Sequence, residues 1–215
     1  MTNPSLFRLN DYLLISFLLL ISMFELKGQN LIQNGSFETG VAGPSLVAKN
    51  WYSCGTKGYT PPNLHNTKNI KPIFKVYTLA QDGDQFISLV TRANQSVECI
   101  GQLLEKSLSI DSTYLLEIYL NSSEFFESRT SIKSTETADF NISADLEVYG
   151  LTKAGQYILI DVYEDIKHYN WKKYTTTFKA LKEFAAIEFR AFFTFDQLLP
   201  YNGHILIDNI TLSRL

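Results

Sequence analysis

Alternation of apolar and polar residues recurs along the chain and predicts its strands. In Thr113–Asn121 the even-numbered positions are all apolar, and Glu117 lies among the odd-numbered positions. Ala185–Phe193 alternates in the same way, with Glu188 and Arg190 falling between apolar residues. Successive side chains of a strand point to opposite faces, so a period of two indicates strands with one buried face.

Short apolar runs separated by turn residues extend this series. Such runs are typical of an all-β sandwich, and amphipathic helix patterns are few. We find neither a linker nor an internal repeat, so residues 29–215 are predicted to form a single domain. Long polar stretches at Gly40–His65 and Ser122–Phe140 are predicted to be loops. The further strands expected are Leu31–Ile32, Ile73–Leu79, Gln85–Val90, Val97–Leu104, Ala144–Tyr149, Tyr157–Tyr163, Tyr174–Ala180 and His204–Ser213.

The N-terminal region has the pattern of a secretory leader. Leu13–Phe24 is apolar apart from two serines, and it is shorter than the roughly 20 residues that a spanning helix needs. We therefore expect residues 1–28 to form a signal peptide that is cleaved after Gly28. Asp11 and Leu26 depart from the usual pattern, so an uncleaved anchor is the alternative. The mature chain is expected to be extracytoplasmic (secreted, cell-surface or periplasmic) and to contain no membrane span.

Composition and charge narrow the class of partner. Hydrophobic residues make up 45% of the 215 residues, which permits one sizeable core. The aromatic content of 13% suits strands, since flat rings pack well on a pleated surface. The net charge of −3 provides no basic face for phosphate, so nucleic acid is not an expected partner.

The chain contains two cysteines, Cys54 and Cys99. In an oxidising compartment such a pair is a candidate disulfide, and two unlinked thiols are the alternative. No histidine pattern accompanies the pair, so a zinc site is not expected.

Six stretches, in this order, carry a resemblance to a known superfamily: NLIQNGSFETG, Trp51, QDGDQFISLV, GQLLEKSLSIDSTYLLEIYL, WKKYTTTFKA and HILIDNITLS. Together they resemble the galactose-binding-like jelly-roll superfamily, especially the carbohydrate-binding modules attached to bacterial glucanases and xylanases. They also resemble the N-terminal β-sandwich of cell-surface and outer-membrane proteins of gliding, polysaccharide-degrading bacteria. The resemblance implies a jelly-roll β-sandwich and a polysaccharide or other glycan as partner.

The resemblance also implies a structural calcium ion. In such modules the ion lies where the opening segment meets the last strand, and the matching acids here are Glu38 and Asp208. Calcium prefers several hard oxygen ligands, and domain termini often lie close together, so we expect the two carboxylates to meet. The alternative is that both acids cap turns or pair with basic residues. Asn209 stands where relatives often have a second acid.

Sugar binding by such sandwiches uses aromatic rings stacked under pyranose faces, with polar side chains that read the hydroxyls. Trp51 and Trp171 match core positions of the resembled modules, so both are expected to be structural. The predicted ligand-binding residues are Tyr52, Tyr59, Phe125, Phe126, Tyr163 and Tyr201.

Catalysis is not expected. Asp161–His168 gathers three acids and a histidine, but such a cluster at a strand end is usually a solvated turn. The chain contains neither a nucleophile elbow nor an H-E-x-x-H motif. We therefore predict a non-catalytic carbohydrate-binding protein. The alternatives are a structural or adhesive cell-envelope protein that binds a protein partner, and a glycoside-active jelly-roll enzyme.

Overall fold

Strands make up nearly all the regular structure of this chain, which confirms the predicted all-β class. The structure, a computed structural model, describes residues 28–59, 61–130, 134–194 and 200–215. The predicted signal peptide lies, except for Gly28, outside the described residues. Within the described ranges no helix is long and apolar enough to cross a membrane.

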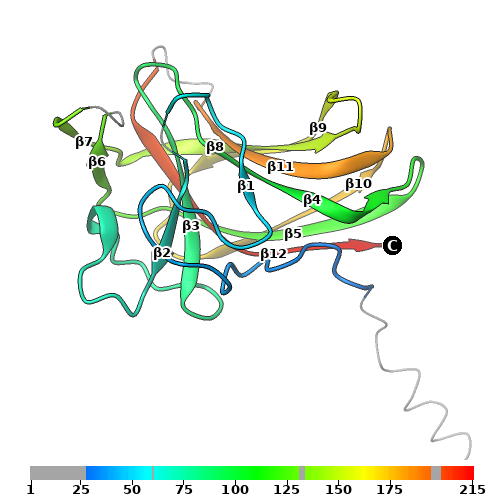
Figure 1. Cartoon of the computed structure of the whole chain (residues 1–215), viewed down its shortest axis with the longest axis horizontal. Coiled ribbons are helices and arrows are strands. Elements are labelled where there is room, and N and C mark those ends of the chain that lie inside the picture. The colour runs from blue at the N-terminus through cyan, green and yellow to red at the C-terminus, as the bar shows by residue number, and fades with distance from the viewer. Residues whose placement is uncertain (1–27, 60, 131–133, 195–199) are drawn as a thin grey trace, which may run out of the picture.

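Two antiparallel sheets face each other as a β-sandwich (Figure 1). Sheet A runs in the order β2 (Asn63–Asn66), β3 (Gln85–Thr91), β12 (Gly203–Arg214), β5 (Thr113–Asn121) and β10 (Lys172–Lys179). Sheet B runs in the order β1 (Tyr52–Ser53), β4 (Cys99–Leu108), β11 (Phe184–Phe192), β8 (Ile142–Leu151) and β9 (Tyr157–Ile166). A short parallel pairing between β8 and β12 joins the two sheets at one end.

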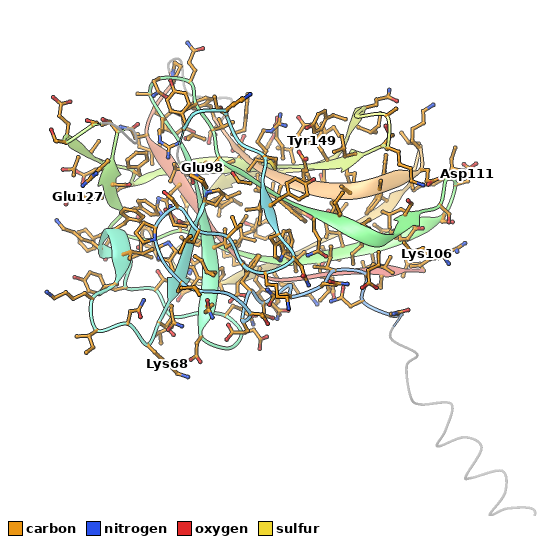
Figure 2. The ribbon with its side chains drawn as sticks, in the orientation of Figure 1. Lys68, Glu98, Lys106, Asp111, Glu127 and Tyr149 are labelled. Carbon is orange, nitrogen blue, oxygen red and sulfur yellow. A yellow bond between two sulfur atoms is a disulfide. The ribbon has the colours of Figure 1, made fainter. Side chains whose placement is uncertain are left out.

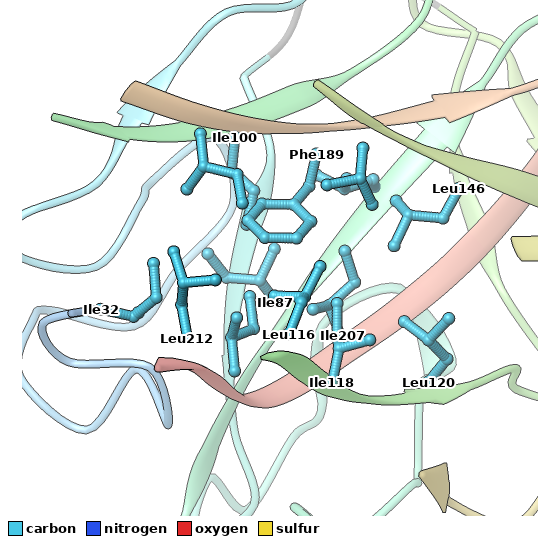
Figure 3. Close-up of a cluster of buried hydrophobic side chains, with 14 of the residues drawn as sticks. Ile32, Ile87, Ile100, Leu116, Ile118, Leu120, Leu146, Phe189, Ile207 and Leu212 are labelled. Carbon is cyan, nitrogen blue, oxygen red and sulfur yellow. The ribbon is translucent and has the colours of Figure 1, made fainter. Parts of the chain in front are cut away.

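The main core lies between the two sheets (Figure 3). Leu116, Ile118 and Leu120 of β5 are fully buried there, as the alternation predicts. Phe189 of β11 and Leu146 of β8 meet them from sheet B and are also fully buried. Burying one such side chain is worth about 1.5–3 kcal/mol, so the alternating strands supply most of the force that holds the sheets together.

A second, smaller core covers part of the outer face of sheet A. Phe86 and Val90 alternate with inward-facing residues of β3, so they lie on the far side of that strand. They pack with Phe126 and Phe140, which come from the long polar stretch that follows β5. This stretch contains the hairpin of β6 (Glu127–Arg129) and β7 (Thr137–Asp139).

Several predicted boundaries need correction. Ile73–Leu79 is not a strand: it begins with the 3-10 turn η1 (Ile73–Lys75), in which Phe74 and Lys75 have positive φ values of 57° and 61°. Leu31–Ile32 is not a strand either, although the Leu31 N–H donates to the Leu212 carbonyl of β12 at 2.7 Å. The predicted loops at residues 40–65 and 122–140 contain short strands, respectively β1 with β2 and β6 with β7.

Candidate ligand-binding face

The outer face of sheet B carries a continuous row of side chains. On β11, Glu188 points away from the core because its neighbours Ile187 and Phe189 point into it. The register aligns Tyr52 with Gly101, Gly101 with Glu188, Glu188 with Tyr149, and Tyr149 with Leu159. The row therefore crosses all the strands of sheet B, from β1 to β9.

This face exposes several apolar and aromatic side chains. The side chains of Tyr157 and Leu159 on β9 are 48% and 51% exposed, and those of Phe192 on β11 and Leu103 on β4 are 42% and 70% exposed. Tyr149 is half-buried beside them, on the side of β8 and β11 that faces away from β5 and β12 (Figure 2). Exposed apolar patches of this kind are typical of binding surfaces.

Arg190 organises two of the tyrosines. Its guanidinium carbon lies 5.0 Å from the centroid of the Tyr149 ring and 5.5 Å from that of Tyr157. The two rings stand 6.0 Å apart at 88° to each other, and the Tyr149 hydroxyl donates to Glu147 at 3.0 Å. A cation over aromatic faces is attracted by their quadrupoles, so Arg190 holds both rings in defined orientations.

Glu188 lies at the centre of the row and is only 2% exposed. Its carboxylate accepts a hydrogen bond from the Tyr52 hydroxyl at 2.9 Å. Burial raises the pKa of Glu188, while hydrogen bonds from Tyr52 and Tyr157 and the charge of Arg190 lower it. Burial also raises the pKa of the Tyr52 and Tyr149 hydroxyls, which therefore stay protonated and able to donate hydrogen bonds near neutral pH.

A disulfide joins Cys54 to Cys99, the pair singled out in the sequence. It links the residue after β1 to the first residue of β4, and the Cys99 sulfur lies 3.7 Å from a Glu188 oxygen. These three residues are the one group of potential metal ligands found among the described residues. Because both sulfurs are bonded to each other, the group does not provide thiolate ligands.

Of the predicted aromatic ligand residues, Tyr52 is the one on this face. Tyr59 lies in the loop after Cys54 and is half-buried, and Phe125 is 52% exposed next to the hairpin of β6 and β7. A ligand-binding role for Tyr59 and Phe125 stays a prediction. Tyr149, Tyr157, Glu188 and Arg190 were not among the predicted ligand-binding residues, although the alternation along β11 already separates Glu188 and Arg190 from the core residues.

The structure contradicts a ligand-binding role for three predicted residues, because their rings are buried. Phe126 is 1% exposed and belongs to the second core. Tyr163 is packed in the main core, where burial raises the pKa of its hydroxyl to about 12 and the hydroxyl meets Thr176 at 2.8 Å. Tyr201 is 8% exposed, and its hydroxyl accepts the N–H of Thr194 at 2.7 Å.

Both tryptophans have the structural positions that were expected. Trp51 is buried in the main core, with its ring centroid 5.2 Å from that of Phe37 and 6.0 Å from that of Phe189. Trp171 is half-buried against the second core, and its indole N–H donates to the Leu79 carbonyl at 2.7 Å.

Glu38 and Asp208 meet at one loop, residues 81–85, which precedes and enters β3. One oxygen of Asp208 accepts the N–H groups of Gln81 and Asp82 at 2.7 and 3.0 Å, and its other oxygen accepts the N–H of the residue that follows it at 2.7 Å. Glu38 Oε1 accepts the next two N–H groups of the loop, from Asp84 at 2.9 Å and from residue 85 at 2.7 Å.

These contacts are those of turn caps, which was the alternative to calcium. Three carboxylate oxygens, both of Asp208 and Oε1 of Glu38, accept backbone N–H groups here, and a cation at these atoms would compete with those donors. A calcium ion held by Glu38 and Asp208 stays a prediction. Burial raises the pKa of Asp208 to about 7, with its hydrogen bonds to backbone N–H groups acting in the opposite direction.

The acidic cluster at the end of β9 does not converge on a common point. The Asp161 carboxylate accepts a hydrogen bond from Thr176, whereas Asp165 pairs with Lys167. His168 stacks on Tyr174, with its Nε2 3.0 Å from the tyrosine hydroxyl. The arrangement has the features of a solvated strand end.

Comparisons with known proteins bear on the fold. No protein family matches the chain, and no curated protein does either. A family 16 carbohydrate-binding module is 19% identical over 86% of this chain and 99% of its own, with a TM-score of 0.45. The CBM22-1 xylan-binding domain of Paenibacillus barcinonensis Xyn10C is 15% identical over 87% and 95% of the two chains, with a TM-score of 0.49.

Larger proteins contain a similar domain. The arabinose-bound α-L-arabinofuranosidase MgGH51 is 11% identical over 86% of this chain and 26% of its own, with a TM-score of 0.50. The chain spans about a fifth, 21%, of the matched enzymatically active domain of bacteriophage CBA120 tailspike protein 4. Identity at this level shows the fold alone, and that fold is a β-sandwich, as predicted.

Proposed function

We propose that this protein binds a neutral polysaccharide on the outer face of sheet B, without catalysis. The observation that carries the proposal is the row from Tyr52 through Glu188 and Tyr149 to Leu159, with Arg190 set between two tyrosine rings. The row crosses the whole sheet, so it offers contacts to several consecutive units of an extended chain.

The chemistry of the face matches that of a sugar ring. A pyranose presents an apolar C–H surface and a rim of hydroxyls, and it needs flat apolar partners beside polar groups in fixed positions. Tyr157 and Phe192 expose ring surface, whereas the hydroxyls of Tyr52 and Tyr149 are anchored on Glu188 and Glu147. Anchored side chains lose little conformational entropy on binding, which favours affinity.

The charges of the face favour a neutral glycan. The cation Arg190 is aligned with Glu147 across β8 and β11, and its charge also acts on Glu188. A uronic acid or a sulfated sugar would therefore meet at least as much negative charge as positive charge. Neutral sugars avoid this repulsion.

The geometry of the carboxylates supports a binding role over hydrolysis. Glycosidases place two carboxyl groups on either side of the scissile bond. Here Glu188 is 2% exposed beneath the tyrosines, and Glu147 is engaged by the Tyr149 hydroxyl. Neither is poised to reach a glycosidic oxygen above the face.

We further infer an extracytoplasmic location. The Cys54–Cys99 disulfide supports it, because disulfides form and persist in oxidising compartments and are rare in the cytosol. The apolar stretch at residues 13–24 points the same way.

Affinity electrophoresis tests the proposal. The purified protein is run through native gels that contain xylan, β-1,4-galactan, mixed-linkage β-glucan or the anionic polygalacturonan. We expect retardation by at least one neutral polysaccharide and its loss in the Tyr157→Ala variant. The control is Tyr77→Ala, since Tyr77 is 71% exposed in the loop after η1 and does not belong to sheet B. Retardation by polygalacturonan alone, or equal loss in both variants, would contradict the proposal.

A second candidate function is binding of a cell-envelope protein. Ile70, Tyr77 and Leu79 are 98%, 71% and 72% exposed, and they line a hollow beside η1. Binding to envelopes whose glycans have been destroyed with periodate, lost in Tyr77→Ala and kept in Tyr157→Ala, would favour this function over glycan binding.

A further inference from the structure

Strand β1 brings Tyr52 to the ligand-binding face, and it is a very short edge strand. It consists of Tyr52 and Ser53, which pair with Gly101 and Ile100 of β4. Among the described residues no strand pairs with its other edge. Two ladder positions on one side hold a strand weakly, so other contacts must fix Tyr52.

Tyr52 lies directly on the backbone of β4. A Cβ atom at Gly101 would fall 2.5 Å from Cζ and 2.6 Å from the hydroxyl oxygen of the Tyr52 ring. Because real Cβ atoms do not approach other atoms so closely, a side chain at position 101 would displace the ring. The hydroxyl then reaches Glu188, to which it donates at 2.9 Å.

The disulfide lies at the end of this short strand. Cys54 follows β1 directly and Cys99 begins β4, so the S–S bond joins the two strands two residues from Tyr52. The backbone continues the same alignment, since the Cys54 N–H donates to the Cys99 carbonyl at 3.0 Å. Glu188 contacts both Tyr52 and the disulfide. One of its oxygens accepts the Tyr52 hydroxyl, and the other lies 3.7 Å from the Cys99 sulfur.

Upstream of Tyr52 the chain has its own anchor. The side chain of Trp51 is buried in the main core, and its indole N–H donates to the Asn34 carbonyl at 3.0 Å. Tyr52 is therefore held between a packed tryptophan on one side and a covalent bond on the other. Without that bond, backbone hydrogen bonds alone would hold the downstream end, among them those from the Cys54 N–H to the Cys99 carbonyl and from the Thr56 N–H to the Val97 carbonyl. The core between the sheets would keep its packing, whereas the Tyr52 ring would be less restricted.

We infer that the Cys54–Cys99 disulfide is a positioning element of the glycan-binding face: it keeps the Tyr52 ring over Gly101 with its hydroxyl on Glu188. The effect of the disulfide on glycan binding rests on the proposed function. The position of the Tyr52 ring can be measured without any ligand. The side chain of Ser53, between the tyrosine and the cysteine, is exposed, so this residue contributes only its backbone pairing with Ile100.

The ligand-free test is NMR on the purified protein and on its Cys54→Ala/Cys99→Ala double variant. Because the Tyr52 ring lies directly over Gly101, its ring current should shift the Gly101 resonances in the disulfide-bonded protein. We expect that shift to vanish in the double variant. Gly150 of β8 packs against the ring of Phe184 of β11 and serves as the matched control. Its ring-current shift should be the same in both proteins. An unchanged Gly101 shift would overturn the inference.

The ligand-dependent test is a double-mutant cycle in gels that contain xylan or β-1,4-galactan. Tyr52→Ala should weaken retention at least fivefold in the disulfide-bonded protein and less than twofold in the double cysteine variant. Equal weakening in both backgrounds would mean that the tyrosine acts independently of the disulfide, which would also overturn the inference. If no gel that contains a neutral polysaccharide retains the wild type, the proposed function is rejected. The NMR result would still decide whether the disulfide positions the Tyr52 ring.

A third measurement covers the case in which the double variant does not fold. The folded wild type is then reduced with a phosphine at 10 °C, and Gly101 is followed while Gly150 still reports a native sheet. Loss of the Gly101 shift before loss of the Gly150 shift supports the inference. Simultaneous loss of both shifts contradicts it, because the disulfide would then hold the whole sandwich and not Tyr52 in particular.

Discussion

His204 is a fully buried residue whose hydrogen bonds require a neutral ring. Its Nε2 accepts the N–H of Ser123 at 2.7 Å, so the proton is on Nδ1, which donates to the Phe140 carbonyl at 2.6 Å. Burial lowers the pKa of His204 to about 4. His65, also buried, has its pKa lowered to about 3 by burial and by His204.

These two buried histidines are expected to lower the unfolding free energy at acid pH. Their native pKa values lie below the unfolded value of about 6.5, so the stability they contribute is complete above pH 6.5 and is lost as pH falls towards 4. For His204 the loss reaches about 3 kcal/mol at pH 4. We expect His204→Gln to lower stability near pH 7 and to reduce the slope of unfolding free energy against pH by about 1.4 kcal/mol per unit between pH 6 and 4.5. Urea unfolding measures the slope, and an unchanged slope would contradict this reading.

Asp208 has the opposite effect on stability: its contribution to the unfolding free energy falls as pH rises over the same pH range. Its native pKa of about 7 lies above the unfolded value, so its contribution is complete below about pH 4 and is lost as pH rises through 7. The loss amounts to about 4 kcal/mol. We expect Asp208→Asn to remove this fall, which urea unfolding at pH 4.5 and 7.5 would detect.

Calcium provides a separate test of the same residue. Since Asp208 and Glu38 cap backbone N–H groups, we expect the melting temperature to be equal in calcium and in chelator at pH 7.5. A rise in calcium that disappears in Asp208→Asn would show that the ion displaces these donors, because binding to the native state alone adds stability by mass action. The capping account would then be wrong and the calcium prediction right.

At the scale of elements, the disulfide closes a loop between β1 and β4. Its cysteines are 45 residues apart, and chain-entropy estimates for a loop of that length give about 4 kcal/mol. We expect the Cys54→Ala/Cys99→Ala variant to lose 2–4 kcal/mol of unfolding free energy, as measured by urea unfolding. Ser53→Ala is the control, because its side chain is exposed beside the disulfide. A loss below 1 kcal/mol would mean that other contacts already restrict this loop in the unfolded chain.

The elements that could be predicted are strands whose side chains alternate and longer apolar runs bounded by turn residues, such as β3 and β12. Thr113–Asn121 and the strand that contains Glu188 were found because one face of each packs into the main core. The two-residue strand β1 and the β6–β7 hairpin are too short to show a period, and both lie within polar stretches. Phe126 was misassigned for a related reason, since no local pattern reveals that a loop folds back over sheet A to form a second core.

At the scale of the whole molecule, the candidate site depends on which sheet face stays open. The second core covers part of the outer face of sheet A, whereas the outer face of sheet B exposes Tyr157, Leu159 and Phe192. This difference is decided by the packing of loops, which the sequence does not reveal. In the sequence, Tyr149 and Tyr157 are therefore indistinguishable from ordinary strand residues. Aromatic residues of the predicted loops were instead proposed as ligand-binding residues.

NMR mapping of a bound oligosaccharide tests directly whether the outer face of sheet B binds glycan. The wild type is titrated with a short oligomer of the neutral polysaccharide that retards it most in gels, and the shifted amides are assigned. We expect the shifts to concentrate at Tyr52, Tyr149, Tyr157, Glu188 and Arg190 on the outer face of sheet B. Shifts confined to the hollow beside η1, or no shifts with any neutral oligomer, would show that this face is not the glycan-binding site.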